Sequence, residues 1–213
     1  MLRLYDYLPS QNAYKVRLLL THLGLPYEQR LVSIFEGESR TPEFLAMNPA
    51  GAVPVLEVAP GDYIAESNAI LCYLAEGTPY LPADRLARGQ VMQWLFFEQD
   101  YVQSTIATLR HWTLTGKLAR RAPQEVANRR GGGEHALDAI ERGLAKQAFL
   151  GSDRMSIADI AVFAYAHRAE EAGFDLVKRR AFRDWVARVE AEPGHLAEEF
   201  PYSIDPFSSR ELG

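Results

Sequence analysis

The sequence is poor in cysteine, with Cys72 as the single thiol among 213 residues. One cysteine excludes an internal disulfide and a Cys-x-x-Cys redox pair, and it is typical of a reducing compartment. Any thiol chemistry must therefore use a thiol from another molecule. Cys72 itself stands among apolar residues in AILCYLAEG, so we expect it to be an inert core residue.

The sequence also lacks a long apolar run and an excess of basic residues. No segment approaches the roughly 18 apolar residues that span a membrane, and the start, MLRLYDYLPS, lacks the basic and apolar regions of a signal peptide. We therefore expect a cytoplasmic protein with no membrane partner. The formal net charge of -5 argues against a nucleic-acid partner, because phosphate binding needs a basic patch.

Strand and helix patterns alternate over the first 80 or so residues. Strands are predicted at residues 2–7, 27–34, 53–58 and 62–66, and helices at residues 12–24, 41–48 and 67–77. Asn12 and Ser67 are the expected N-caps of the first and last helices, and Gly24 and Gly77 end them. This alternation predicts an α/β domain over residues 1–78.

The segment Thr78–Asp84, TPYLPAD, contains two prolines and no periodicity, so it is predicted to be a linker. Helices are then expected at residues 86–114, 135–150, 156–173 and 182–193, with an irregular tail over residues 200–213. The third of these is apolar on nearly all sides and should be buried. Residues 85–213 thus form an expected all-α domain, and the fold class is α/β plus all-α.

Three consecutive glycines, Gly131 to Gly133, interrupt the helical pattern in RRGGGEHAL. Each glycine costs about 1 kcal/mol relative to alanine inside a helix. Either the helix begins after the glycines or it bends there. No strand precedes them and no Gly-Lys-Ser/Thr follows, so a phosphate-binding loop is a weak interpretation.

The segment NPAGAVPVLE places Pro54 at the start of a predicted strand, where proline cannot donate a ladder hydrogen bond. A cis-proline there would leave the backbone N–H and C=O of Val53 unpaired and able to bind an extended peptide. The alternative is a trans-proline at a sheet edge.

NPAGAVPVLE followed by IAESNAI resembles the glutathione-binding half of the glutathione transferase family, and SIADIAVFAY resembles the buried helix of its second domain. In the latter, Ser156 and Asp159 would form a capping box. The resemblance covers nearly the whole chain. It implies a thioredoxin-like N-terminal domain with a cis-proline at Pro54, followed by an all-helical domain that lines the electrophile site.

The resemblance also implies roles for individual residues in binding glutathione. The Val53 backbone would pair with the cysteinyl part, while Glu66 and Ser67 would hold the γ-glutamyl end. A helix N-terminus at Ser67 favours a carboxylate, and Glu66 can accept from an ammonium. The alternative is an ordinary helix cap preceded by a surface acid.

The glycyl carboxylate at the other end of glutathione needs a cation. Arg40 and Lys15 are the candidates for this contact. Each of them is equally compatible with a solvated surface charge.

The chemistry is expected in YLPSQNAYKVR, between the first strand and the first helix. A thiol becomes a good nucleophile as thiolate, which hydrogen-bond donors and a helix N-terminus stabilise. Ser10 fits this role, and the segment looks like the serine-type, theta-like branch of the family. Asn12 could serve instead, with Ser10 as a turn residue. Tyr5 and Tyr7 are interpreted as packing residues.

The second substrate is expected against the long helix of the all-α domain. The candidates for lining its site are Tyr101, Thr105, Arg110 and Trp112. Aromatic residues at helical spacing are also typical of a core or, in this family, of a subunit interface.

The resulting prediction is a homodimeric glutathione transferase that activates glutathione for conjugation to a small hydrophobic electrophile. Glutathione is a co-substrate, and no metal or redox cofactor is implied. One alternative is a glutathione-dependent disulfide or peroxide reductase. Another is a non-catalytic binding module that keeps the fold.

Overall fold

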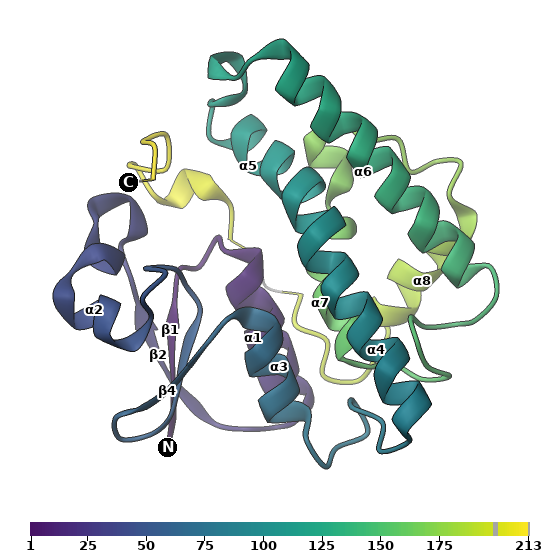
Figure 1. Cartoon of the computed structure of the whole chain (residues 1–213), viewed down its shortest axis with the longest axis horizontal. Helices are drawn as coiled ribbons and strands as arrows, with labels where there is room; N and C mark the ends of the chain where they lie inside the picture. The colour runs from purple at the N-terminus through teal and green to yellow at the C-terminus, as the bar shows by residue number, and fades with distance from the viewer. Residues whose placement is uncertain (198–199, 213) are drawn as a thin grey trace. The chain divides into compact units, whose positions relative to one another are not determined.

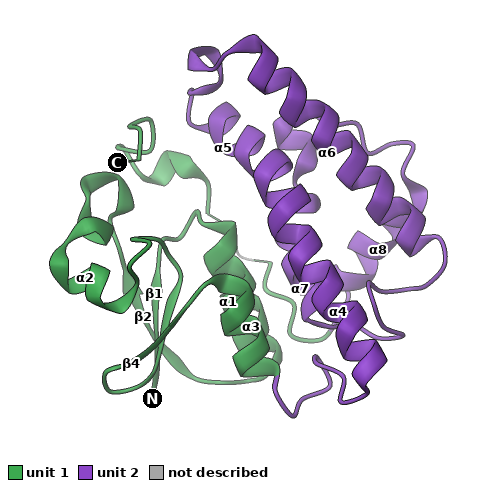
Figure 2. Ribbon diagram, in the orientation of Figure 1, with its two compact units in different colours: residues 1–75, 193–213 green, residues 76–192 purple. Residues whose placement is uncertain are grey.

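The computed structural model describes residues 1–197 and 200–212, and the chain divides into two compact units (Figures 1 and 2). Unit 1 combines residues 1–75 with residues 193–213, and unit 2 comprises residues 76–192. The expected second domain, residues 85–213, is therefore corrected at its end. The tail belongs to the first unit because its side chains and carbonyls bond to that unit, as described below.

Unit 1 is built on a four-stranded sheet in the order β2-β1-β3-β4. The strands are β1 (Leu2–Asp6), β2 (Tyr27–Leu31), β3 (Val55–Ala59) and β4 (Asp62–Ala65). β1 pairs parallel with β2 and antiparallel with β3, while β3 and β4 form the predicted antiparallel hairpin. The parallel pair requires a crossover, which the first helix supplies.

Helices cover both faces of this sheet (Figure 1). α1 (Gln11–His22) and α3 (Ser67–Ala75) pack together on one face, with Leu4, Leu56 and Ile70 fully buried between the layers. α2 (Pro42–Met47) lies on the other face, after the short helices η1 (Ile34–Glu36) and η2 (Glu38–Arg40). There Phe44 packs with Val32 and Val55.

Tyr5 and Tyr7 are packing residues, as predicted. The Tyr5 ring lies edge-on to Phe44 with 6.3 Å between centroids. Tyr7 is 7% exposed, packs edge-on to Phe35, and donates its hydroxyl to Asp205 Oδ2 at 2.9 Å. Burial and this hydrogen bond raise the pKa of Tyr7 far above its usual range, so the phenol stays protonated.

The described residues of unit 2 form helices joined by loops, without a strand, and every residue of α7 (Ile157–Ala166) is buried. α7 packs against α4 (Arg85–Phe97), η3 (Glu98–Ala107) and α8 (Arg180–Glu190). The other helices of unit 2 are α5 (Thr108–Leu114), η4 (Leu118–Arg120), α6 (Pro123–Leu144) and η5 (Ala169–Ala172). The predicted helix at residues 86–114 is thus divided, because η3 is a π-helical segment between two α-helices. Such segments occur often at functional sites.

The predicted capping box at the start of α7 is confirmed. Ser156 Oγ accepts from the Ala158 amide at 3.2 Å, and Asp159 Oδ2 accepts from the Ser156 amide at 2.9 Å. Asp159 Oδ1 also accepts from the Leu150 amide at 2.8 Å and from Trp185 Nε1 at 2.9 Å. This fully buried carboxyl therefore joins α7 to α8 and to the segment before α7.

The three glycines lie inside α6, which neither starts after them nor is divided there. A Cβ on Gly132 would stand 2.8 Å from Thr105 Cγ2, and one on Gly133 would stand 2.3 Å from Phe174 Cζ. Real Cβ atoms do not approach so closely, so a glycine is required wherever α6 meets these neighbours. Gly132 and Gly133 thus permit tight packing of α6, whereas a Cβ on Gly131 would meet nothing within 4 Å.

Candidate functional site

The loop Tyr7–Ser10 joins β1 to α1 and presents Ser10 at the helix N-terminus. Ser10, not Asn12, is the N-cap: its backbone is extended, and its Oγ accepts from the Ala13 amide at 3.3 Å. The expected cap at Asn12 is wrong because the helix already begins at Gln11. As an acceptor in this bond, the Ser10 hydroxyl keeps its own proton available for donation.

A buried ion pair between Arg17 and Asp6 is hydrogen-bonded to this loop. Arg17 Nη1 donates to Asp6 Oδ1 at 2.8 Å and Oδ2 at 2.7 Å, and Nη2 donates to the Leu8 carbonyl at 3.0 Å. Gln29 Nε2 adds a third bond to Asp6 at 2.7 Å. Sequence reasoning missed these residues; the available signal was an aspartate at an inward position of an alternating strand.

The peptide bond between Val53 and Pro54 is cis, as the resemblance implied, so the trans alternative is excluded. Within the described residues, neither the N–H nor the C=O of Val53 makes a hydrogen bond. Tyr5 pairs with Val55 and Val55 pairs with Ala65. Continuing this register brings Val53 beside Tyr7 on one side and Ser67 on the other.

Ser67 connects the N-termini of α1 and α3. Its Oγ donates to Asn12 Oδ1 at 3.3 Å, and Lys15 Nζ donates to the same Oγ at 3.4 Å. Lys15 is fully buried at this point. Lys15 is therefore not a solvated surface charge, and α1 carries its ammonium group to Ser67, the residue expected at the γ-glutamyl end.

Glu66 is exposed and stands immediately before α3. Its carbonyl accepts from the Ile70 amide at 2.9 Å, so Glu66 holds the cap position and Ser67 is the first helical residue, which corrects the expected cap at Ser67. Glu66 has a φ of 68°, the only left-handed value at a non-glycine residue in the described part of the chain. Such backbone strain clusters at functional sites.

Arg40 lies beside the loop that leads to Val53. Its Nη1 donates to the Ala50 carbonyl at 2.8 Å, and a Cβ on Gly51 would come within 2.3 Å of that nitrogen. Asn48 shapes the same loop through bonds to Ala50 N at 3.0 Å and to Ala52 O at 2.8 Å. The guanidinium remains exposed, as a carboxylate partner requires.

The four side chains expected to line the electrophile site have different surroundings in unit 2. Tyr101 is 51% exposed, whereas the methyl of Thr105 faces Gly132 in α6. Arg110 is 2% exposed and pairs with Glu171 at 2.5 Å. Trp112 is 8% exposed and lies between Arg121 and Arg129, each 4.9 Å from its ring centroid. Of the four, Tyr101 is therefore the most exposed, while Arg110 and Trp112 are held in contacts within unit 2.

The Arg110 ion pair also involves Arg168, which contacts the same carboxylate. Burial favours the neutral form of Glu171, but Arg168 and Arg110 outweigh it and lower the pKa of that carboxyl. Arg110 is thus held in a structural network.

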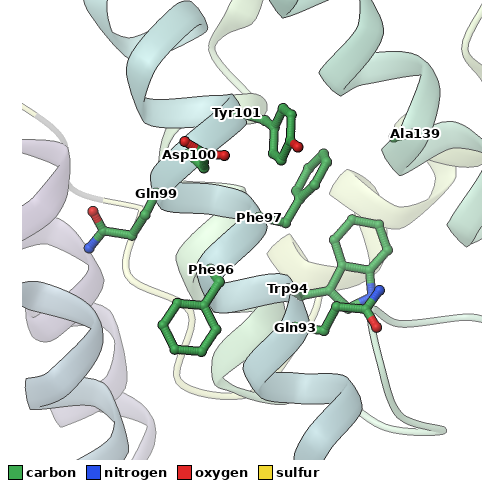
Figure 3. Close-up of a pocket in the computed structure, with 8 residues that line it drawn as sticks. All are labelled: Gln93, Trp94, Phe96, Phe97, Gln99, Asp100, Tyr101 and Ala139. Atoms are coloured by element: carbon green, nitrogen blue, oxygen red, sulfur yellow. The ribbon is translucent and has the colours of Figure 1, made fainter.

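Tyr101 lines a large open cavity of about 760 Å³ in unit 2 (Figure 3). The rings of Trp94, Phe97 and Tyr101 follow one another along the helix, with 5.0 Å between successive centroids. Phe96 is 68% exposed at the same cavity. Exposed apolar patches of this kind mark sites that bind a ligand or another protein.

Other expectations concern cysteine, metal ions and membranes. Cys72 is half-buried rather than a core residue. The described residues contain no cluster of His, Cys, Asp or Glu able to hold a metal ion. None of the described helices is both long and apolar enough to cross a membrane.

Comparison with known proteins identifies both halves of the chain. Residues 1–76 match the model of the glutathione S-transferase N-terminal domain, and residues 123–188 match that of the C-terminal domain. Among solved structures, a glutathione S-transferase from Pseudomonas fluorescens is 42% identical, with a TM-score of 0.88 over 92% of this chain and 97% of that one. A family member from the same organism, solved with two glutathione bound, is 27% identical with a TM-score of 0.77, covering 91% and 89%.

Three curated relatives differ in the reactions that their names give. The glutathione S-transferase GstB of Escherichia coli is 31% identical over 91% of this chain and 95% of its own. A maleylacetoacetate isomerase of Pseudomonas aeruginosa is 31% identical over 82% and 84%. The disulfide-bond oxidoreductase YfcG of E. coli is 26% identical over 91% and 92%. Both domains match in the order of the family, and the chain belongs to the glutathione S-transferase family of enzymes.

Proposed function

We propose that this chain conjugates glutathione to a small hydrophobic electrophile, with Ser10 as the residue that stabilises the thiolate. The thiol proton passes to solvent, the sulfur forms a bond to the electrophilic carbon, and the leaving group departs with its electron pair. The observation that carries the proposal is the Ser10 hydroxyl, which caps α1 as an acceptor and so can donate its proton. The helix N-terminus adds favourable potential for the anion.

Glutathione binding is proposed along the same end of the sheet. The unpaired Val53 backbone next to Pro54 supports strand-like pairing with the cysteinyl unit. Glu66 and Ser67 would hold the γ-glutamyl ammonium and carboxylate, and Lys15 adds positive charge behind Ser67. Arg40 would receive the glycyl carboxylate.

Thiolate formation tests this proposal directly. Glutathione is titrated into the protein across pH while the ultraviolet absorbance of thiolate is followed, in the wild type and in Ser10→Ala and Asn12→Ala. We expect thiolate near neutral pH that Ser10→Ala loses and Asn12→Ala keeps. The reverse pattern would assign activation to Asn12, and binding without thiolate would favour a binding module.

Disulfide reduction is a second candidate, supported by the similarity to a disulfide-bond oxidoreductase. Two glutathione molecules would become glutathione disulfide while the substrate disulfide is reduced to two thiols, without a protein cysteine. Turnover of 2-hydroxyethyl disulfide, compared with that of 1-chloro-2,4-dinitrobenzene, distinguishes the two reactions.

A symmetric homodimer is proposed through the aromatic cavity of unit 2, with a second copy of the chain as the occupant. Phe96 and Tyr101 are 68% and 51% exposed, more than such rings usually are on a monomer. Phe96→Glu should produce a monomer in sedimentation measurements, while Leu86→Glu, at an exposed α4 position outside the cavity, should not. The cytoplasmic location stays a prediction.

A further inference from the structure

A second cavity, of about 320 Å³, lies within unit 1 beside the loop that carries Ser10. Its walls come from three segments: Asp6 to Pro9, the stretch from Leu31 to Glu36, and the tail from Ile204 to Phe207. Ser10 follows Pro9 directly, and its amide donates to the Tyr7 carbonyl at 2.8 Å. The cavity wall therefore ends at Pro9, directly before Ser10, the residue proposed to activate the thiol.

The tail is fixed against this loop by specific hydrogen bonds. Asp205 accepts from Tyr7 Oη at 2.9 Å and from the Phe207 amide at 2.8 Å. Further back, Tyr14 Oη donates to the Leu196 carbonyl at 2.6 Å. Tyr7 and Tyr14 lie on either side of Ser10 in the sequence, so the tail is held at both ends of the Ser10 segment.

The inside of the cavity is apolar. Leu31 and Ile204 face it from different walls and are 54% and 50% exposed, and Leu8, Pro9 and Phe207 complete the lining. Its volume lies at the lower end of the roughly 300–1,000 Å³ that ligand pockets span. One substituted aromatic ring is an appropriate occupant.

The charged side chains of the lining, Asp6, Glu36 and Asp205, are all acidic. Asp6 is paired with Arg17, but Glu36 and Asp205 form no ion pair in the described part of the chain. None of the described lining residues is a lysine, arginine or histidine. Arg210 lies 3.9 Å from the Phe207 ring centroid without lining the cavity. A carboxylate entering here would meet two groups of its own charge.

We propose that this cavity binds the second substrate and selects uncharged or cationic apolar electrophiles over carboxylates. The inference rests on the proposed conjugation and adds the loop and the tail of unit 1 to the residues proposed to contact the electrophile. It also separates this chain from its isomerase relative, whose name indicates an acidic substrate.

Charge selection is tested with two acceptors of nearly the same shape, 4-chloro-3-nitrobenzamide and 4-chloro-3-nitrobenzoate. Each kcat/KM is divided by the uncatalysed rate with glutathione. The wild type should prefer the amide at least about fivefold, the factor expected for like charges about 4 Å apart that are screened as strongly as in water. Glu36→Gln should lower this preference, whereas Glu43→Gln, an equal charge change at an exposed position of α2, should not. Equal use of both acceptors by the wild type, or an unchanged ratio in Glu36→Gln, would overturn the proposal.

The location is tested by binding, which needs no reaction. Calorimetry measures the affinity of 4-chloro-3-nitrobenzamide with and without saturating S-methylglutathione, which has no free thiol. Ile204→Ala and Phe207→Ala should weaken binding at least about fivefold, the effect of removing several buried methylene groups. Leu212→Ala, an exposed tail position outside the cavity, should leave it unchanged, and none should alter the affinity for S-methylglutathione.

The outcomes separate this proposal from the proposed function. If Ile204→Ala weakens binding of the amide but the amide is never conjugated, the proposed conjugation is wrong and the proposed binding pocket is retained. If the amide fails to bind, or if it binds and reacts as well in Ile204→Ala as in the wild type, the pocket proposal is overturned.

Discussion

Arg17 and Asp6 form a buried ion pair in which one guanidinium nitrogen lies 2.8 and 2.7 Å from the two carboxylate oxygens. The side chains are 5% and 0% exposed. The other terminal nitrogen of Arg17 holds the Leu8 carbonyl, two residues before Ser10. The pair therefore connects the interior of unit 1 to the position of the proposed activating hydroxyl.

Arg17→Met should lower the free energy of unfolding by about 3–5 kcal/mol, because it leaves the Asp6 charge buried without a partner. Arg17→Lys keeps the charge but cannot bond Asp6 and Leu8 together in the same planar geometry. Arg17→Lys should therefore lose less stability than Arg17→Met. It should still raise the pKa of the thiol of bound glutathione, which is measured by thiolate absorbance. Arg30→Lys on the exposed β2 is the control. A folded Arg17→Lys protein with the wild-type thiol pKa would show that Arg17 does not position the loop.

Ser10 should contribute to stability and to activity in separable ways. Ser10→Ala removes an N-cap and should destabilise the protein by about 1 kcal/mol, whereas Ser10→Gly should cost only a few tenths. Both variants lack the hydroxyl, so both should lose neutral-pH thiolate and most of the conjugating activity. Thermal unfolding and kinetics on the same samples check this. A glycine variant with normal activity would contradict the assignment of Ser10.

Gly133 and Gly131 should respond in opposite directions to the same substitution. A Cβ at Gly133 would stand 2.3 Å from Phe174 Cζ, so Gly133→Ala should destabilise the protein by about 1–3 kcal/mol. Gly131 has no neighbour within 4 Å, and Gly131→Ala should stabilise α6 by up to about 1 kcal/mol. Urea unfolding of the two variants measures the contrast. Combining Gly133→Ala with Phe174→Leu should recover part of the loss if the clash is its cause.

Asp159 should make stability depend on pH in the direction opposite to an ordinary salt-bridged carboxylate. Burial raises the pKa of Asp159 from 3.8 to about 6, despite the hydrogen bonds from Leu150, Ser156 and Trp185 that favour the carboxylate. Between these two pKa values the folded state binds more protons than the unfolded state. The contribution of Asp159 to the stability of the protein is therefore lost as the pH rises through about 6. The difference between a pKa of 3.8 and one of about 6 corresponds to about 3 kcal/mol of stability.

This dependence is isolated by subtracting the curve of Asp159→Asn from that of the wild type. The wild type should lose stability relative to the variant from about pH 4 to pH 7, and the difference should be flat above that range. A difference that grows in favour of the wild type would mean that the donated hydrogen bonds dominate and that the folded-state pKa is lowered.

Local patterns were sufficient to predict much of the fold. Alternation identified β1 to β4 within a few residues, and the apolar run around Ile160 identified the buried α7. The capping box of Ser156 and Asp159 followed from their spacing alone. These features depend on neighbours within one or two turns, which a sequence displays directly.

Features that depend on distant neighbours could not be predicted in this way. The glycines of α6 favour a helix break by propensity, but contacts with Thr105 and Phe174 override it. The sequence left Lys15 open between a glycyl contact and a surface charge, because its partner, Ser67, is 52 residues away. Arg110 was a candidate for lining the electrophile site, and nothing local in the sequence indicates its pairing with Glu171.

The attachment of the tail to Tyr7 and Tyr14 has a consequence for the order of synthesis. Residues 193–212 are translated after all of unit 2, yet they complete unit 1. Domains generally fold as they emerge, N-terminal first. The nascent sheet must therefore wait, one side of its Ser10 loop uncovered, until a whole further domain has left the ribosome.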